Sequence, residues 1–138
     1  MNLAKAEFNP STSELVIADE LRLPVPIDEI GKLPRTSMTV GVRPENLYPI
    51  TPETKAEDVF HVEVTNVEIL GNETVFSFKL GGEEWMAKWS GQWHIDIGDR
   101  MPVRMEFESL SIFDEQSGEL IKGTIDYGKY VKQQKVSP

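Results

Sequence analysis

The chain has 138 residues, no cysteine and a net charge of −9 at pH 7, from 14 basic and 23 acidic residues. The lack of cysteine excludes disulfides, thiolate metal sites and a cysteine nucleophile, and the acidic balance argues against nucleic acid as a partner, because affinity for phosphate backbones comes from basic residues. No apolar run approaches the roughly 20 residues of a membrane helix and the first residues show no signal pattern, so we expect no direct membrane insertion.

Alternating apolar and polar residues predict short antiparallel strands in the first part of the chain. Residues 14–18 and 20–25 are expected to form two strands joined by a tight turn at Asp19. Apolar residues then recur at every second position from Met38 to Val42, which predicts another strand with one buried face.

Helix is expected only as single turns. Residues 28–32 and 44–47 each have room for one turn, which is too short to be stable without packing. Prolines 49 and 52 mark residues 51–58 as an exposed connector between two groups of strands.

The longest predicted strand, Val59–Leu70, contains one break in its alternation. Three apolar residues before position 65 share a face, whereas Val67 and Ile69 have the opposite phase. One extra residue near positions 65–66 would restore the face, so we predict a β-bulge there. A bulged long strand lets a small sheet bend into a barrel.

A hairpin is expected to follow this strand. Residues 74–80 alternate with Thr74, Phe76, Phe78 and Leu80 on one face, and residues 83–89 form the partner strand. Gly81 and Gly82 lie between them, and glycine adopts the positive φ angles that a two-residue hairpin turn requires.

The last predicted strands lie between residues 101 and 121. Residues 101–107 alternate with Met101, Val103, Met105 and Phe107 on one face, and residues 112–121 read as a hairpin. In its turn, Asp114 is placed to accept hydrogen bonds from amides two or three residues later, and Gly118 to take a positive φ. The segment lacks the alternating oxygen ligands of a calcium loop, so we expect turn chemistry rather than calcium binding.

Residues 122–138 differ in composition from the rest. They carry four lysines against Asp126, a local charge of +3, which leaves −12 on residues 1–121. We expect residues 1–121 to form the folded domain, with 122–138 as a partly frayed C-terminal extension.

The segment Arg43-Pro44-Glu45 is the first candidate for chemistry. Proline fixes φ and favours an extended residue before it, so the strand should end at Arg43. Glu45 then lies in the first turn, where a carboxylate is favourable. Three interpretations of Arg43 stay open: a structural latch between a strand end and a nearby loop, a contact with a partner, or a ligand site.

The segment Leu70-Gly71-Asn72-Glu73-Thr74 is the second candidate. Glycine and asparagine favour a turn that fixes strand register. Residues 72–74 also match the glycosylation sequon, but no secretory signal accompanies it.

Three tryptophans, Trp85, Trp89 and Trp93, recur every four residues. Trp85 and Trp89 share a strand face, and Trp93 lies in a loop-like stretch after Gly91. Aromatic residues on a sheet face are usually core, but a protein interface or a platform for stacking sugars stays open.

No catalytic constellation is evident. His61 and His94 are isolated, and Glu83 and Glu84 are adjacent on a strand, so they point to opposite faces. The sequence has neither a G-x-x-x-x-G-K-[ST] phosphate loop nor a G-x-G-x-x-G turn. We therefore expect a non-enzymatic chain.

Four short motifs in a fixed order carry a family resemblance. In chain order they are G-V-R-P-E, L-G-N-E-T, Gly98-Asp99 before a strand, and F-D-E-Q-S-G. This series resembles the C-terminal regulatory part of ATP-binding subunits of ABC sugar importers of the maltose and glycerol-3-phosphate type. The resemblance covers roughly residues 1–121. Its motif and interaction candidates are Arg43, Pro44, Glu45, Leu70, Gly71, Asn72, Glu73, Thr74, Asp99, Phe113, Asp114 and Gly118.

The resemblance implies an all-β fold of small oligonucleotide/oligosaccharide-binding type barrels, the TOBE arrangement, in which two small barrels interlock. It also implies a cytoplasmic protein peripheral to the inner face of the membrane. The implied partners are a second copy of the subunit, an ATPase domain, transmembrane permease subunits and a regulatory protein. ATP and Mg²⁺ would bind the nucleotide-binding domain, so no cofactor is expected in this chain.

Two alternatives remain from the sequence. One is an oxyanion-binding barrel of the molybdate type, against which the acidic composition argues. The other is a carbohydrate-binding module that uses Trp85, Trp89 and Trp93.

Overall fold

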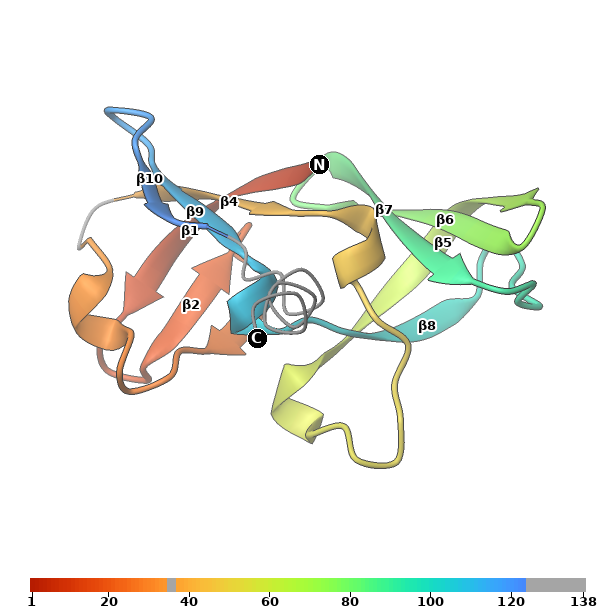
Figure 1. The fold of residues 1–138 in the computed structure, drawn as a ribbon, viewed down its shortest axis with the longest axis horizontal. Helices are drawn as coiled ribbons and strands as arrows, with labels where there is room; N and C mark the ends of the chain where they lie inside the picture. The colour runs from red at the N-terminus through yellow and green to blue at the C-terminus, as the bar shows by residue number, and fades with distance from the viewer. Residues whose placement is uncertain (35–36, 124–138) are drawn as a thin grey trace, which may run out of the picture.

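The computed structural model describes residues 1–34 and 37–123, and this part of the chain forms ten β-strands in two antiparallel sheets with four single-turn 3₁₀ helices (Figure 1). The expected all-β fold with little helix is confirmed. The expected C-terminal extension falls almost entirely on residues 124–138, which lie outside the described residues. No helix in the described part is long and apolar enough to cross a membrane.

The larger sheet has six strands in the order β10-β9-β4-β1-β2-β3. All of its neighbouring strands are antiparallel. Its strands, in chain order, are β1 (Asn2–Asn9), β2 (Glu14–Ile17), β3 (Leu21–Pro24), β4 (Met38–Val42), β9 (Ser111–Asp114) and β10 (Leu120–Lys122).

The smaller sheet has four strands in the order β7-β6-β5-β8. Its strands are β5 (Val59–Leu70), β6 (Glu73–Leu80), β7 (Glu83–Ser90) and β8 (Arg100–Arg104). The 3₁₀ helices lie in the connections and are η1 (Ile30–Lys32), η2 (Pro44–Asn46), η3 (Ala56–Asp58) and η4 (Phe107–Ser109).

The chain passes between the two sheets twice. It leaves the larger sheet after β4, builds the whole smaller sheet, and returns through η4 to add β9 and β10 beside β4 (Figure 1). A single cut in the chain therefore cannot separate the sheets. Their buried side chains belong to one apolar cluster.

Local turn and register predictions are confirmed. The β5–β6 register shifts between Val64 and Asn66, where the bulge was predicted. Ala18 and Asp19 have φ values of 54° and 59°, as the tight turn between β2 and β3 requires. The β9–β10 turn also follows the sequence, because Asp114 Oδ1 accepts hydrogen bonds from the amides of residues 116 and 117 at 2.8 and 3.1 Å.

Three features differ from the sequence-based expectations. Strand β1 was not predicted, although its alternate residues are buried from Asn2 to Phe8. The strand predicted over 101–107 ends at Arg104, because the chain turns into η4 to return to the larger sheet. Ile69 lies on the face of β5 that the sequence predicted to be buried, but it is 53% exposed, because its end of β5 extends past the core.

Asn2 joins the two sheets. Its side-chain Nδ2 donates to the carbonyl of Met86 in β7, and its Oδ1 accepts from the Met86 amide, both at 2.9 Å. Trp85 Nε1 adds a bond to the carbonyl of Leu3 at 3.2 Å. The side-chain amide of Asn2 thus satisfies the backbone groups of Met86 at the edge of β7, as a neighbouring strand would.

Candidate functional site

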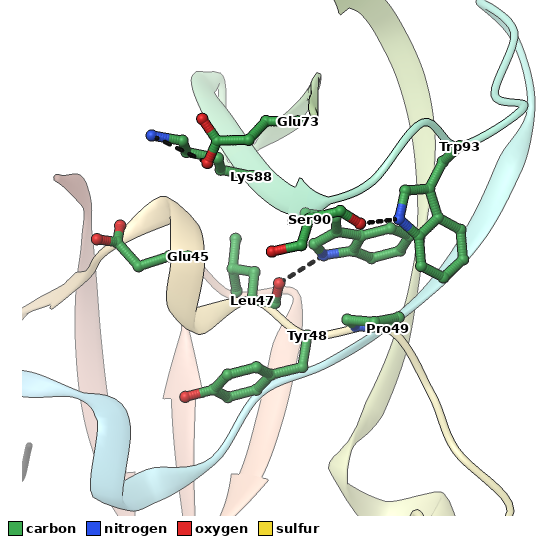
Figure 2. Close-up of a pocket in the computed structure, with 9 residues that line it drawn as sticks. Glu45, Leu47, Tyr48, Pro49, Glu73, Lys88, Ser90 and Trp93 are labelled. Atoms are coloured by element: carbon green, nitrogen blue, oxygen red, sulfur yellow. Dashed lines mark hydrogen bonds and ion pairs between the residues drawn. The ribbon is translucent and has the colours of Figure 1, made fainter. Parts of the chain in front are cut away.

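A groove lies where η2 and the residues after it run beside β7. Pro44 occupies the first position of η2, where its missing amide hydrogen costs nothing and its φ suits a helical turn. The groove has a volume of about 370 Å³ (Figure 2). Its lining consists of Glu45, Leu47, Tyr48, Pro49, Glu73, Lys88, Trp89, Ser90 and Trp93.

Trp89 forms the buried back of the groove. Its indole is 3% exposed, packs edge-on against Phe76 at 4.8 Å between ring centroids, and donates from Nε1 to the carbonyl of Leu47 at 2.6 Å. This bond fastens the chain after η2 to β7, so the two walls of the groove keep a fixed spacing.

Trp93 stands at one end of the groove and is 38% exposed. Three contacts hold it. Its Nε1 donates to the carbonyl of Ser90 at 2.8 Å, its backbone amide donates to Thr74 Oγ1 at 2.9 Å, and its ring meets Trp89 edge-on at 4.8 Å. An exposed aromatic surface is therefore held in one orientation.

The L-G-N-E-T turn supports Trp93 from behind. Thr74, fully buried, donates from Oγ1 to the carbonyl of Gly91 at 2.8 Å, while the carbonyl of Asn72 accepts from the Gly91 amide at 2.5 Å. Gly71 takes the positive φ of this turn, at 59°. Its carbonyl accepts from Gln92 Nε2 at 3.2 Å.

Tyr48 forms the other wall and is held at both ends. Its backbone exchanges two hydrogen bonds with Arg104 of β8, at 2.8 and 2.9 Å. Its hydroxyl lies 3.2 Å from Asn46 Oδ1 and 3.1 Å from Ser109 Oγ. The Arg104 guanidinium lies 4.4 Å from the centre of the Tyr48 ring and pairs with Glu106.

The rim of the groove carries charges of both signs. Glu73 and Lys88 form an ion pair at 3.4 Å with both side chains nearly half exposed. Glu45 is exposed and forms no ion pair with any residue in the ranges 1–34 and 37–123. In the same ranges, no group of three or more histidine, aspartate or glutamate side chains is placed to hold a metal ion.

Among residues 1–34 and 37–123, Arg43 does not form the side-chain latch considered from the sequence. Its side chain is exposed and has no hydrogen bond or ion pair with another described residue. The contact that closes this turn uses the Arg43 carbonyl, which accepts from the Asn46 amide at 2.9 Å. The segment that fastens to β7 lies four residues later, at Leu47.

The structure brings the first two motifs together but not the other two. Glu45 and Glu73 line the same groove, and Thr74 supports it. Asp99 lies in the loop before β8, where its carbonyl accepts from the Val64 amide at 2.9 Å. Three motif residues belong to the β9–β10 hairpin of the other sheet, namely Phe113, Asp114 and Gly118.

The three-tryptophan sugar platform is wrong. Trp85 is 1% exposed and Trp89 is 3% exposed, and both indole N–H groups bond to backbone carbonyls inside the protein. Of the three, Trp93 alone presents a broad surface to solvent.

Sequence reasoning missed the groove residues Tyr48 and Lys88. No local pattern marks them, because a bridge to β8 and the pairing of β6 with β7 bring them to the groove. The usable signal was the proline at 49, which ends the short turn before the connector.

Comparisons with known proteins agree on one family. Residues 40–113 match the family model described as the TOBE domain. The chain is 31% identical over 83 residues to the sn-glycerol-3-phosphate import ATP-binding protein UgpC of Cupriavidus metallidurans, which covers 60% of this chain and 22% of that protein. It is 28% identical over 99 residues to the xylose/arabinose import ATP-binding protein XacK of Haloferax volcanii, covering 69% of this chain and 25% of that protein.

A longer match extends over 118 residues at 26% identity, to the UgpC protein of Pectobacterium atrosepticum, and covers 86% of this chain and 32% of that protein. The chain thus spans less than a third of the length of these relatives. The match to the family model runs from β4 into β9, so it contains the whole smaller sheet and the groove.

Proposed function

Because the chain belongs to the TOBE domain family, we propose that it is a non-catalytic regulatory and dimerisation domain of the ATP-binding subunit of an ABC-type carbohydrate importer. The observation that carries this proposal is the match of up to 86% of the chain to import ATP-binding proteins, in a segment that makes up less than a third of each.

In this proposal the domain works beside an ATPase domain that binds ATP and Mg²⁺. The subunit lies at the inner face of the membrane, where it contacts permease subunits, a second copy of itself and a regulatory protein. In this proposal the chain contributes binding surfaces to the assembly rather than a catalytic site.

Isothermal titration calorimetry with MgATP tests the non-catalytic part. We expect no heat of binding from this chain, with the intact UgpC protein of Cupriavidus metallidurans as a positive control. Saturable MgATP binding or ATP hydrolysis by the purified chain would contradict the proposal.

Analytical ultracentrifugation tests the dimerisation part. A two-fold interface uses the same surface on both copies, so the average mass should rise with protein concentration toward twice that of the monomer. A single monomeric species at every concentration would remove dimerisation from the proposal and leave the family assignment in place.

A further inference from the structure

A second groove, which we call the acidic groove, lies where three connections between strands meet. These connections are the segment after β3, the 3₁₀ helix η3 before β5, and η4, through which the chain returns to the larger sheet. The groove has a volume of about 420 Å³. The apolar part of its lining consists of Pro24, Val25, Pro26 and Phe107.

The charged part of this lining is mostly negative. It consists of Glu57, Asp58, Glu106, Glu108 and Lys55. Glu106 pairs with Arg104, but the other three carboxylates form no ion pair with a residue in the ranges 1–34 and 37–123. Burial raises the pKa of Asp58, and the three glutamates raise it further, whereas Lys55 lowers it. Since one lysine and one arginine face four carboxylates, the acidic groove keeps a net negative charge.

The end of β10 brings a lysine to the edge of the acidic groove. Lys122 Nζ donates to the carbonyls of Glu108 and Leu110, at 3.3 and 2.7 Å, and lies 5.0 Å from the centre of the Phe107 ring. Phe107 and Glu108 both line the groove. The described part of the chain therefore ends, at Gly123, next to a lysine that already contacts this groove.

The residues that follow Gly123 carry the opposite charge. Residues 124–138 have a net charge of +2, which leaves −11 on residues 1–123, since the whole chain carries −9. The charged residues of this segment are Asp126, Lys129, Lys132 and Lys135. The first of these lysines is six residues from Gly123, and six extended residues span roughly 20 Å. The segment is therefore long enough to lie along the acidic groove.

The arrangement of the carboxylates distinguishes between a metal ion and a basic segment. In the ranges 1–34 and 37–123, no group of three or more aspartate, glutamate or histidine side chains is placed to hold a metal ion. Carboxylates that do not converge on one point are matched better by several separate ammonium groups. The long apolar stems of lysine side chains can also pack on the apolar part of the groove while their ammonium groups stay at its rim.

We propose that residues 124–138 dock into the acidic groove of the same chain, with their lysines paired with Glu57 and Glu108. Each ion pair at an exposed site is weak, so the docking depends on several pairs and on the short tether, which keeps the local concentration of the segment high. Composition alone predicts fraying of this segment, because it has no face to bury, but the groove supplies partner charges. The inference does not depend on the proposed role in an importer.

Paramagnetic relaxation enhancement, measured by nuclear magnetic resonance on the 138-residue chain, tests this docking. The chain has no cysteine, so Gln133→Cys provides a single site for a nitroxide label. The label should broaden the amide resonances of Glu57 and Phe107. It should leave that of Gly71 unchanged, because Gly71 follows the far end of β5 from η3, and a strand of this length spans roughly 40 Å. The broadening should weaken as salt approaches about 1 M, where the screening length is about 3 Å.

Charge changes in the segment test the role of its lysines. Replacing Lys129, Lys132 and Lys135 together with glutamine keeps the length of the segment but removes its positive charge. The enhancement at Glu57 and Phe107 should then fall severalfold. The matched variant with arginine at the same three positions keeps the charge and should retain the enhancement.

Charge changes in the groove test the other partner. Glu57→Gln combined with Glu108→Gln should also reduce the enhancement severalfold. The matched control is Glu83→Gln combined with Glu84→Gln, which removes the same charge from two exposed positions on β7, outside the acidic groove. This control should behave like the wild type. Unchanged amide resonances far from the groove would show that each variant keeps the fold.

Three results would overturn the proposal. The first is an enhancement at Glu57 and Phe107 no larger than that at Gly71. The second is an enhancement that survives both the lysine-to-glutamine change and the double change in the groove. The third is an enhancement of the same size on unlabelled ¹⁵N chains mixed with labelled chains, which would place the segment on a second copy. Because ATP binding and self-association are measured separately, the first two results would leave the proposed function untouched.

Discussion

Replacing Asn2 with alanine removes the side chain that connects the two sheets. In the native structure this side chain is 7% exposed, and its amide forms two hydrogen bonds of 2.9 Å with the backbone of Met86. The substitution leaves one donor and one acceptor of β7 without their partners. Strand β1 keeps its pairing with β2 and β4, so the fold should survive the change.

The expected loss follows from these two bonds. Each contributes about 0.5–1.5 kcal/mol net, and an unsatisfied group costs about 1–3 kcal/mol where water cannot replace its partner. Since Met86 lies at a sheet edge that water partly reaches, we expect a total loss of about 2 kcal/mol. With a urea m-value of about 2 kcal/mol per molar, the unfolding midpoint should fall by about 1 M.

Urea denaturation monitored by tryptophan fluorescence provides the assay. Asn72→Ala is the matched control, because that asparagine is exposed and its side chain forms no hydrogen bond with a described residue. Asn2→Asp keeps the acceptor for the Met86 amide but directs a carboxylate oxygen at the Met86 carbonyl. Its loss of stability relative to the wild type should therefore become smaller in acid, where the protonated carboxyl group can donate to that carbonyl. A midpoint for Asn2→Ala equal to that of the control would refute the connection between the sheets.

Three further predictions use the same unfolding assay. Gly81→Ala should lower the free energy of unfolding by about 1–3 kcal/mol more than Gly71→Ala does. Both glycines have φ near 60°, but a Cβ at Gly81 would lie 2.7 Å from the Cβ of Ala18, whereas a Cβ at Gly71 meets no atom within 4 Å. Equal losses of stability in the two variants would contradict this prediction. Burial, with a smaller effect from the preceding glutamate, raises the pKa of Asp58 above its usual 3.8, so the folded state binds this proton more tightly than the unfolded state. The resulting destabilisation of the folded state is present above the raised pKa and absent below pH 3.8. Asp58→Asn should therefore be more stable than the wild type at neutral pH but not below pH 3.8. A stability difference between the two proteins that does not change with pH would argue against this assignment. Trp89→Phe should cost about 1–3 kcal/mol through its lost indole bond, and an unchanged midpoint would show that this bond does not hold the groove wall.

The hairpins could be predicted because their determinants are local. A bulge shows in the sequence as a phase change in the alternation, which places it between Val64 and Asn66. Turns at Gly81-Gly82 and Gly118 follow from the ability of glycine to take positive φ. These features depend on neighbours within about ten residues, so the sequence around each one is sufficient.

The candidate site was only partly predictable. The sequence indicated Glu45, Glu73 and an exposed Trp93, but it did not show that they line one groove. The sequence placed Trp89 on a strand and Trp93 in a loop-like stretch, and the first is 3% exposed and the second 38% exposed. Their difference arises because the chain after η2 covers Trp89 and accepts its hydrogen bond.

The sequence by itself determined that this protein is an all-β chain of short antiparallel strands, where each strand turns, and which family its motifs resemble. Tertiary structure alone decided that both ends of the described chain share one sheet, that Asn2 closes the edge of β7, and that two separate motifs meet in a groove. The physical reason is the range of the interactions. Alternation and turn chemistry act between near neighbours, whereas the bond between Asn2 and Met86 joins residues 84 positions apart, and no local pattern specifies such a partner.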